Sequence, residues 1–289
     1  MASMRDIKRR KESIQSTGQI TKAMKLVSTV KLQKAKGRAD CTKPYFKCMY
    51  DTVAQILKKA GNIDHPYLKT NTDNSKKAVI LISSNRGLAG GYNSNMVKLV
   101  TEMDAKKEDI VIYAVGRKAK DSLARKGYKI ERDYSEVVND ALYSDAMTIG
   151  RQVVQDYSDG KFGEIYLAYT EFKNTVVHIP KMIKLLPFGL EEKEDDKDSA
   201  IDDLTLMNFE PEEEEALDLI IPKYINSLIY GGIVESIASE NGARMQAMDS
   251  ATSNAETMID DLSLKYNRAR QASITQEITE IVAGASAIN

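Results

Sequence analysis

The sequence predicts an α/β fold in which a long antiparallel coiled coil of the N- and C-terminal helices is combined with a central Rossmann-like, mainly parallel α/β domain. The two ends of the chain, 1–60 and 210–289, carry uninterrupted helical patterns. Residues 76–190 alternate between strand-like and helix-like segments. An acidic stretch, 191–209, separates that middle part from the C-terminal helix, and we expect it to be a loop.

The first helix is expected over residues 3–60. Gly18, Gly37 and Pro44 fall inside it, and Gly61-Asn62 is a typical end signal. Its apolar positions form a narrow stripe that Thr17 and Thr21 interrupt. The stripe consists of Met4, Ile7, Ile14, Ile20, Met24, Val27 and Val30.

Short apolar runs of the kind found in strands buried on both faces mark the central domain. The expected strands are Lys77–Ser83, Asp109–Val115, Gly163–Phe172 and His178–Leu186. Helical patterns lie between them, at Asn93–Met103, Arg117–Lys126 and Asp140–Asp156. The alternation predicts a mainly parallel sheet with helices packed on it and right-handed crossovers.

The second long helix is expected over 210–286, with Pro211 in its first turn. A strict 4-3 spacing, the signature of a coiled-coil seam, holds in it for more than five heptads. The seam consists of Val234, Ala238, Asn241, Met245, Met248, Thr252, Ala255, Ile259, Leu262, Tyr266, Ala269 and Ser273. Many of these side chains are small or polar, so packing per heptad is weak. At 1.5 Å per residue the two helices are about 85 and 115 Å long, too long for a compact domain, so they are expected to pair antiparallel.

Charge is distributed unevenly, although the net charge of the 289 residues is only −1. Residues 1–47 hold 13 Lys or Arg against 3 Asp or Glu, whereas residues 191–218 hold 2 against 14. Such asymmetry predicts separate surfaces for separate partners. Cys41 and Cys48 are seven residues apart, too far on a helix for a disulfide and not spaced as a zinc site. No apolar run approaches the roughly 20 residues that cross a bilayer, so the chain is expected to be cytosolic or attached to a membrane only through partners.

The motifs that usually mark a chemical site are missing from the sequence. The turn Ser83–Asn93 (SSNRGLAGGYN) follows a strand and precedes a helix, where a phosphate loop would lie, but it matches neither GxGxxG nor GxxxxGK[ST]. His65 and His178 belong to no HExxH or Cys/His cluster. We therefore expect no catalytic residue, no metal, no cofactor and no direct nucleotide binding.

Two other interpretations remain open at this point. The basic N-terminal helix is typical of proteins that bind nucleic acid or anionic lipid. However, it has no aromatic residue before Tyr45 to stack on bases, so we expect no nucleic acid. A small nucleotide-binding enzyme that uses the 83–93 turn is the second alternative, and it predicts measurable nucleotide affinity.

Three segments resemble the γ subunit of bacterial F-type ATP synthase. They are Ile7–Ala35, with ITKAM at Ile20–Met24; the SSNRGLAGGYNSN turn; and Tyr266–Ala285, YNRARQASITQEITEIVAGA. Ser239–Met248 and Leu185-Leu186-Pro187 also match. Many family members have Asp where this chain has Asn85, and Cys where it has Ala89. The dithiol-bearing insertion of the chloroplast form is absent.

The resemblance implies the role of a rotating shaft with no catalytic site of its own. In the family, the coiled coil lies inside a ring of α and β subunits, and the α/β domain with the ε subunit grips the c-ring. Ion flow turns the c-ring, and the shaft drives ATP synthesis or hydrolysis at β. The location implied is the cytoplasmic face of the bacterial plasma membrane. Positions that match the family's contacts with β are Arg270, Gln271, Arg244, Met24, Lys8 and Arg9.

Overall fold

The computed structural model describes residues 4–60, 65–68, 75–189 and 213–288. The chain divides into two compact units. The helix-pair unit is Met1–Val30 with Arg244–Asn289, and the α/β unit is Lys31–Ala243. We describe each unit by itself. The predicted acidic loop 191–209, the Gly61-Asn62 end signal and Pro211 lie outside the described residues.

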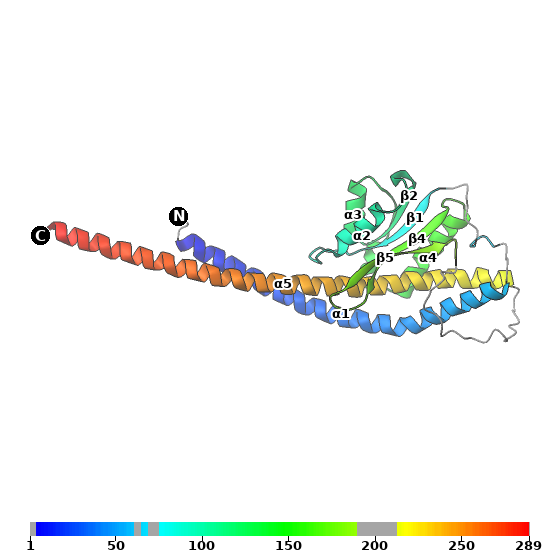
Figure 1. Cartoon of the computed structure of the whole chain (residues 1–289), viewed down its shortest axis with the longest axis horizontal. Coiled ribbons are helices and arrows are strands. Elements are labelled where there is room, and N and C mark those ends of the chain that lie inside the picture. The colour runs from blue at the N-terminus through cyan, green and yellow to red at the C-terminus, as the bar shows by residue number, and fades with distance from the viewer. Residues whose placement is uncertain (1–3, 61–64, 69–74, 190–212, 289) are drawn as a thin grey trace. The chain divides into compact units, whose positions relative to one another are not determined.

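Two long helices contribute to both units (Figure 1). Helix α1 spans Met4–Ala60 and α5 spans Glu213–Ile288, so both predicted helices are confirmed to within three residues at each end. Pro44 lies inside α1 and Pro222 inside α5. Neither proline ends its helix, although each removes one backbone donor.

The α/β unit contains a five-stranded sheet in the order β3-β2-β1-β4-β5. The pairs β3–β2, β2–β1 and β1–β4 are parallel, and the edge pair β4–β5 is antiparallel. The strands are β1 Lys77–Ile82, β2 Ile110–Val115, β3 Lys129–Asp133, β4 Glu164–Phe172 and β5 His178–Leu186. The shorter helices are α2 Tyr92–Thr101, η1 Lys107–Asp109, α3 Arg117–Arg125, η2 Ser135–Asn139 and α4 Tyr143–Ser158.

The sheet confirms the four predicted strands and adds a fifth that the sequence pattern did not reveal. Strand β3, KIERD, is charged and largely exposed, because it lies at the edge of the sheet and needs no apolar face. Helix α4 begins at Tyr143, three residues later than predicted, after Leu142 adopts an extended conformation at the N-cap.

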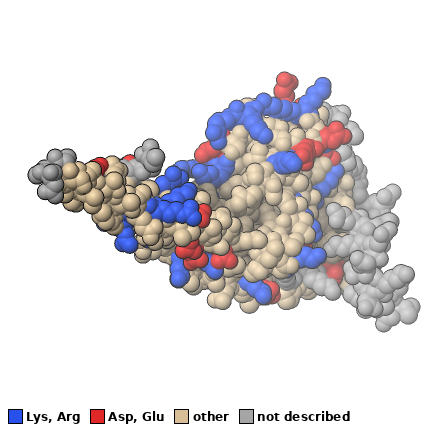
Figure 2. Space-filling model, turned by 60° about the vertical axis from the view of Figure 1, so that its left-hand side comes forward, with Lys and Arg blue, Asp and Glu red and all other residues tan. Residues whose placement is uncertain are grey.

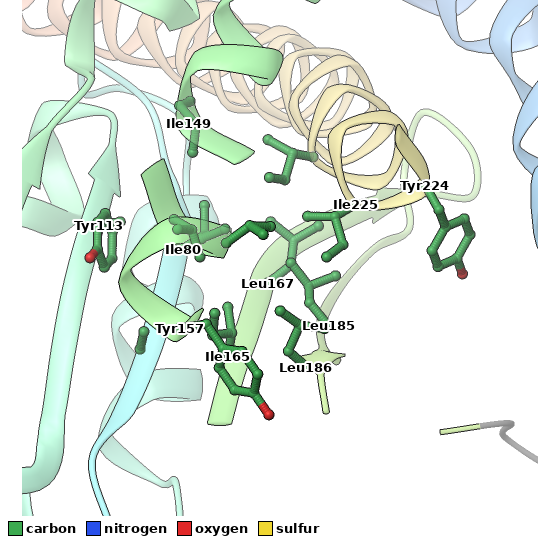
Figure 3. Close-up of a cluster of buried hydrophobic side chains, with 14 of the residues drawn as sticks. Ile80, Tyr113, Ile149, Tyr157, Ile165, Leu167, Leu185, Leu186, Tyr224 and Ile225 are labelled. Carbon is green, nitrogen blue, oxygen red and sulfur yellow. The ribbon is translucent and has the colours of Figure 1, made fainter. Parts of the chain in front are cut away.

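Side chains that alternate along the central strands build a separate core on each face of the sheet. On one face, Ile80 and Leu167 pack with Ile149 of α4 and with Ile225 of α5 (Figure 3). On the other face, the core combines strand residues with α2 and α3 residues, including Val79, Leu81, Ile112, Met96, Val100 and Leu123. Each fully buried Ile or Leu contributes about 1.5–3 kcal/mol. The α5 segment in the first core fixes where the helix enters the α/β unit.

A glycine allows the backbone that follows β1 to lie close to the start of α3. Gly116, which precedes α3, has a φ of +119°. A Cβ atom built there would lie 2.1 Å from the carbonyl oxygen of Ser83. Since that atom belongs to the backbone of the neighbouring turn, it cannot move aside as a flexible side chain could. Any larger residue must separate the two turns.

Gly116→Ala is therefore expected to lower the free energy of unfolding by about 3 kcal/mol or more, from backbone strain and overpacking together. Urea denaturation of the isolated chain, followed by tyrosine fluorescence, measures the change. The control is Gly37→Ala in α1, where nothing lies within 4 Å of the added Cβ. This control is expected to stabilise by about 0.5–1 kcal/mol. Equal stability of the Gly116 variant and the wild type would contradict the packing described here.

Candidate partner-contact surface

In the helix-pair unit, α1 and α5 run antiparallel and meet along a seam of small side chains. A Cβ on Gly18 would lie 3.4 Å from the Cβ of Ala255. The hydroxyls of Thr21 and Thr252 are 2.8 Å apart, and Lys25 Nζ lies 2.5 Å from Asp249 Oδ1. Each step forward on α1 corresponds to a step back on α5, which confirms the predicted pairing.

The seam explains why one part of the sequence interpretation was wrong. Ile20, Val27 and Val30, predicted in the α1 stripe, are 58%, 57% and 67% exposed, whereas Thr21, predicted to interrupt it, is 8% exposed. Threonine is tolerated here because its hydroxyl bonds to the Gly18 carbonyl of its own helix and to its partner across the seam. Small residues let the helices approach at these positions, so Ile20, Val27 and Val30 point outward, whereas Met248 and Leu262 of α5 stay buried at 4% and 9% exposed.

The α5 helix continues past the end of α1. Continued by helical steps, the seam register places Met4 opposite Ala269. Beyond Ser273, every residue up to Ser286 is exposed, as expected for a helix that outlasts its partner. Large apolar residues in this tail recur at spacings of four, three and one: Ile274, Ile278, Ile281 and Val282, all between 47% and 70% exposed. In Figure 2 this end of α5 is mostly uncharged.

All six residues that the resemblance singled out lie in the helix-pair unit. Lys8, Arg9, Arg270 and Gln271 are exposed, and Met24 is half-buried. Arg9 forms a 3.8 Å ion pair with Asp6 of its own helix, and both side chains are largely exposed. Arg270 and Gln271 follow directly after Ala269, the residue that the register places opposite Met4, so they lie where the paired part of α5 ends.

Arg244 differs from the other five, because its side chain is 8% exposed and is engaged within the chain. The exposed apolar side chains of α1 and of the α5 tail were not singled out from the sequence. For the α5 tail, the spacing of the isoleucines in SITQEITEIV is a signal that could have revealed it.

Comparisons with known proteins agree with this arrangement over the full length. The ATP synthase family model matches residues 3–288. The ATP synthase gamma chain of Lachnoclostridium phytofermentans is 68% identical over 292 residues, with 100% of both chains covered. This chain belongs to the ATP synthase γ chain family.

More distant members extend the same match. The gamma chain of Acetobacterium woodii, described as sodium ion specific, is 41% identical, with 99% of each chain covered. A chain of the Euglena gracilis mitochondrial ATP synthase has the same fold, with a TM-score of 0.68, 18% identity and coverage of 99% of this chain and 94% of that one. A chain from the central stalk and c-ring structure of Tetrahymena thermophila mitochondrial ATP synthase has a TM-score of 0.56 at 23% identity, with 80% and 99% covered.

The turn that carries the γ-chain signature joins three elements of the α/β unit. Three of its residues accept hydrogen bonds from the first three backbone amides of α3. Asn85 Oδ1 accepts from Arg117 N at 3.1 Å. The Ser84 carbonyl oxygen accepts from Lys118 N at 3.0 Å, and Ser83 Oγ accepts from Ala119 N at 3.3 Å. These groups stand where an anion would bind a free helix N-terminus. These bonds favour the interpretation of the turn as a structural element and not as a phosphate-binding loop.

Asn85 also donates through Nδ2 to the Ser135 carbonyl at 2.6 Å and to Asn139 Oδ1 at 3.3 Å. The Asp that many family members have here could not donate either bond. In this chain the amide therefore ties η2 to the signature turn.

The described residues offer neither a metal site nor a membrane-spanning helix. No group of three or more His, Cys, Asp or Glu side chains within the described ranges is arranged to hold a metal ion. Among the same residues, no helix combines the length and apolar character required to span a bilayer. Cys41 and Cys48 are both free and exposed, as the spacing predicted.

The seam predicts a specific disulfide. In a Cys41→Ser, Cys48→Ser background, Gly18→Cys with Ala255→Cys is expected to crosslink under mild oxidation, because the Cβ atoms lie close to disulfide spacing. The control pair, Gly18→Cys with Met258→Cys, places the second thiol on an exposed face and is expected to stay reduced. Mobility on a non-reducing gel distinguishes them. Equal crosslinking of both pairs would contradict the register.

The internal hydrogen bonds of the signature turn also predict that the isolated chain has negligible affinity for nucleotide. Titration of the isolated chain with Mg-ATP in a calorimeter is expected to give no saturable heat at micromolar concentrations, since the α3 amides are already bonded. A dissociation constant in the micromolar range would mean that the turn binds phosphate, and would revive the nucleotide-enzyme interpretation.

Proposed function

We propose that this chain is the central rotary shaft of an F-type ATP synthase and carries no catalytic site itself. Its role is to couple ion-driven rotation of the c-ring to ATP synthesis or hydrolysis at the β subunits. Membership of the γ chain family over residues 3–288 supports this role. So does the construction of the chain from two helices of 57 and 76 residues, far longer than globular cores require.

One observation carries the proposal most directly, namely the unpaired apolar tail of α5. Ile274, Ile278 and Ile281 are exposed on a helix that has no partner from α1 at this level. A solitary helix of this composition gains no burial of its own, and exposed apolar surface of this kind marks an interaction site. A surrounding ring of subunits would cover the tail on all sides.

The partners follow from the same proposal. The α and β subunits surround the helix-pair unit, while the ε subunit and the c-ring bind the α/β unit. The chain then lies at the cytoplasmic face of the bacterial plasma membrane, attached through the complex.

Exposed polar groups near the last paired residues of α5 and the first turns of α1 are proposed to contact the β subunit. Arg270 presents a guanidinium fork that can bind a carboxylate through two parallel bonds, and Gln271 adds an amide. Lys8 and Arg9 place further positive charge on α1. A single such bond at a partly exposed interface is worth roughly 1–3 kcal/mol, enough to change barriers along a rotary cycle.

Further along α1, Met24 lies beside the exposed side chains of Ile20 and Val27 and is proposed to contact the β subunit through apolar surface. Arg244 is also proposed to meet β. Because its side chain is 8% exposed, only the edge of its guanidinium is available, and a partner would share it with the group it already contacts.

Arg270→Ala is expected to lower the ATPase turnover of the assembled complex by one to two orders of magnitude, the factor that about 1.4–2.8 kcal/mol gives. Arg270→Lys is expected to recover only part of the rate, since lysine keeps the charge but loses the fork. Steady-state ATPase assays on reconstituted complexes, with subunit stoichiometry checked on a gel, measure both variants.

Arg268→Ala is the matched control, because it removes an exposed positive charge two residues away on a different face of α5. Its turnover is expected to stay within about twofold of the wild type, as for most exposed single charges. Wild-type turnover in a fully assembled Arg270→Ala complex would leave shaft shape, and not this bond, as the source of coupling.

A further inference from the structure

The end of the β4–β5 hairpin packs on α5 through a histidine. Phe172, the last residue of β4, pairs with His178, the first residue of β5, and their ring centroids are 6.0 Å apart. A Cβ atom built on Gly242 of α5 would lie 2.6 Å from His178 Nε2 and 3.6 Å from Phe172 Cε2. The imidazole therefore lies directly on the backbone of α5, where only glycine leaves room for it. We call this packing the His178 contact.

Hydrogen bonds from the preceding turns of α5 hold the same hairpin. The Thr170 amide donates to Ser236 Oγ at 3.1 Å, and Ser239 Oγ donates to the Thr170 carbonyl oxygen at 3.2 Å. Gly242 follows three residues after Ser239, so these attachments lie along one side of the helix. The α/β unit ends on α5 at Ala243, one residue after Gly242. The His178 contact thus secures the hairpin to the last α5 residues of this unit.

The contact requires a neutral imidazole. His178 Nε2 is buried and has no hydrogen-bond partner among the described residues. Protonation would place a positive charge on the ring and make each ring nitrogen a donor, and a buried donor without an acceptor is costly. Burial accordingly lowers the pKa of His178 below its ordinary value of 6.5. A proton on His178 therefore opposes the packing on Gly242.

On α5, the charged residues nearest to the contact point away from it. Glu240 and Arg244 each lie two residues from Gly242, a spacing that places them on other sides of the helix. The residues three or four positions away share the side of Gly242, and all are uncharged. They are Ala238, Ser239, Met245 and Gln246.

The charged residues of the hairpin do not compensate a proton on His178 either. Glu171 alternates with Phe172 along β4, so the two side chains point to opposite faces of the sheet. Its carboxylate pairs with Lys181 at 2.9 Å. Lys173, on the other side of Phe172 in the sequence, is exposed. A protonated imidazole thus gains most by leaving the contact for water.

We propose that the His178 contact is an acid-sensitive device, which holds the end of the β4–β5 hairpin on α5 while the imidazole is neutral and releases it when the imidazole takes up a proton. The released ring titrates at its ordinary pKa of 6.5, and the packed ring only at lower pH. The contact is therefore fully stable above about pH 6.5 and weakens as the pH falls below that value. The device belongs to the chain itself and does not depend on the shaft function.

Imidazole NMR of the full chain tests the titration. The chain holds two histidines, His65 and His178, and the signals lost in His178→Phe identify residue 178. We expect His178 to protonate with a midpoint below 6.5. A midpoint at or above 6.5 would overturn the proposal.

A glycine variant tests the packing that causes the lowered midpoint. In Gly242→Ala the added Cβ meets the end of the imidazole, a side chain that moves aside without unfolding the helix. The midpoint of His178 is expected to rise toward 6.5. Gly37→Ala, where nothing lies within 4 Å of the added Cβ, is the control and is expected to leave the midpoint unchanged. An unchanged midpoint in Gly242→Ala would reject the role of the contact.

Thiol labelling measures the release itself. In a Cys41→Ser, Cys48→Ser background, Ser239→Cys places a thiol under the hairpin, at a position that is 0% exposed. Its reaction rate with 4,4′-dithiodipyridine is measured at about pH 7.5 and about pH 5.5, one unit below the pKa of a free imidazole. The same measurements on the chain that also carries His178→Phe remove the pH dependence of the thiol. Circular dichroism confirms the fold at both pH values.

The expected result is an acid-induced rise in the labelling rate that His178→Phe abolishes. Relative to that variant, the chain with His178 is expected to gain up to about tenfold, the factor by which one pH unit favours the released imidazole. Equal ratios of the two rates in both chains would overturn the proposal.

Discussion

The close approach of α1 and α5 along a seam of Gly, Ala and Thr side chains is the constraint on which the helix-pair unit depends. A Cβ added at Gly18 would already be in van der Waals contact with Ala255, and the hydroxyls of Thr21 and Thr252 are 2.8 Å apart, so the helices lie close together at these levels. Several larger apolar side chains of the unit, including Ile20, Val27 and Val30, are therefore exposed instead of buried between the helices. A pair of this kind is narrow, and its remaining stabilisation must come from what surrounds it. This requirement agrees with a shaft inside a ring of subunits.

Much of the fold could be predicted because its signals are local and strong. Helices α1 and α5 have long periodic patterns, and β1, β2, β4 and β5 are apolar runs bounded by polar residues. The charged edge strand β3 gave no such signal, and the antiparallel direction of β5 depends on a turn that apolar pattern does not encode. The α1 stripe was assigned wrongly since apolar spacing alone cannot tell a side chain buried against a helix of its own chain from one left for a partner. Ile20 and Val27 are exposed in this chain, so the apolar spacing alone misplaced them in the seam.

The contact residues are harder to derive, because a contact between subunits leaves no geometry in one chain. Arg270, Gln271, Lys8 and Arg9 have the exposure that a contact requires, but so does any solvated charge. The exposed fraction is more informative where a charged side chain is buried or a large apolar side chain is exposed. It sets Arg244 apart as a residue engaged within the chain, and it reveals the exposed isoleucines of the α5 tail.

Rotation of this chain inside an assembled complex tests the central claim most directly. A bead attached at Val176→Cys, in a Cys41→Ser, Cys48→Ser background, reports the angle of the α/β unit while the β subunits are fixed to a glass surface. With Mg-ATP, the account predicts continuous rotation in one direction, with pauses in multiples of three per turn for three catalytic subunits. Sustained ATP hydrolysis by complexes whose beads do not turn would contradict it.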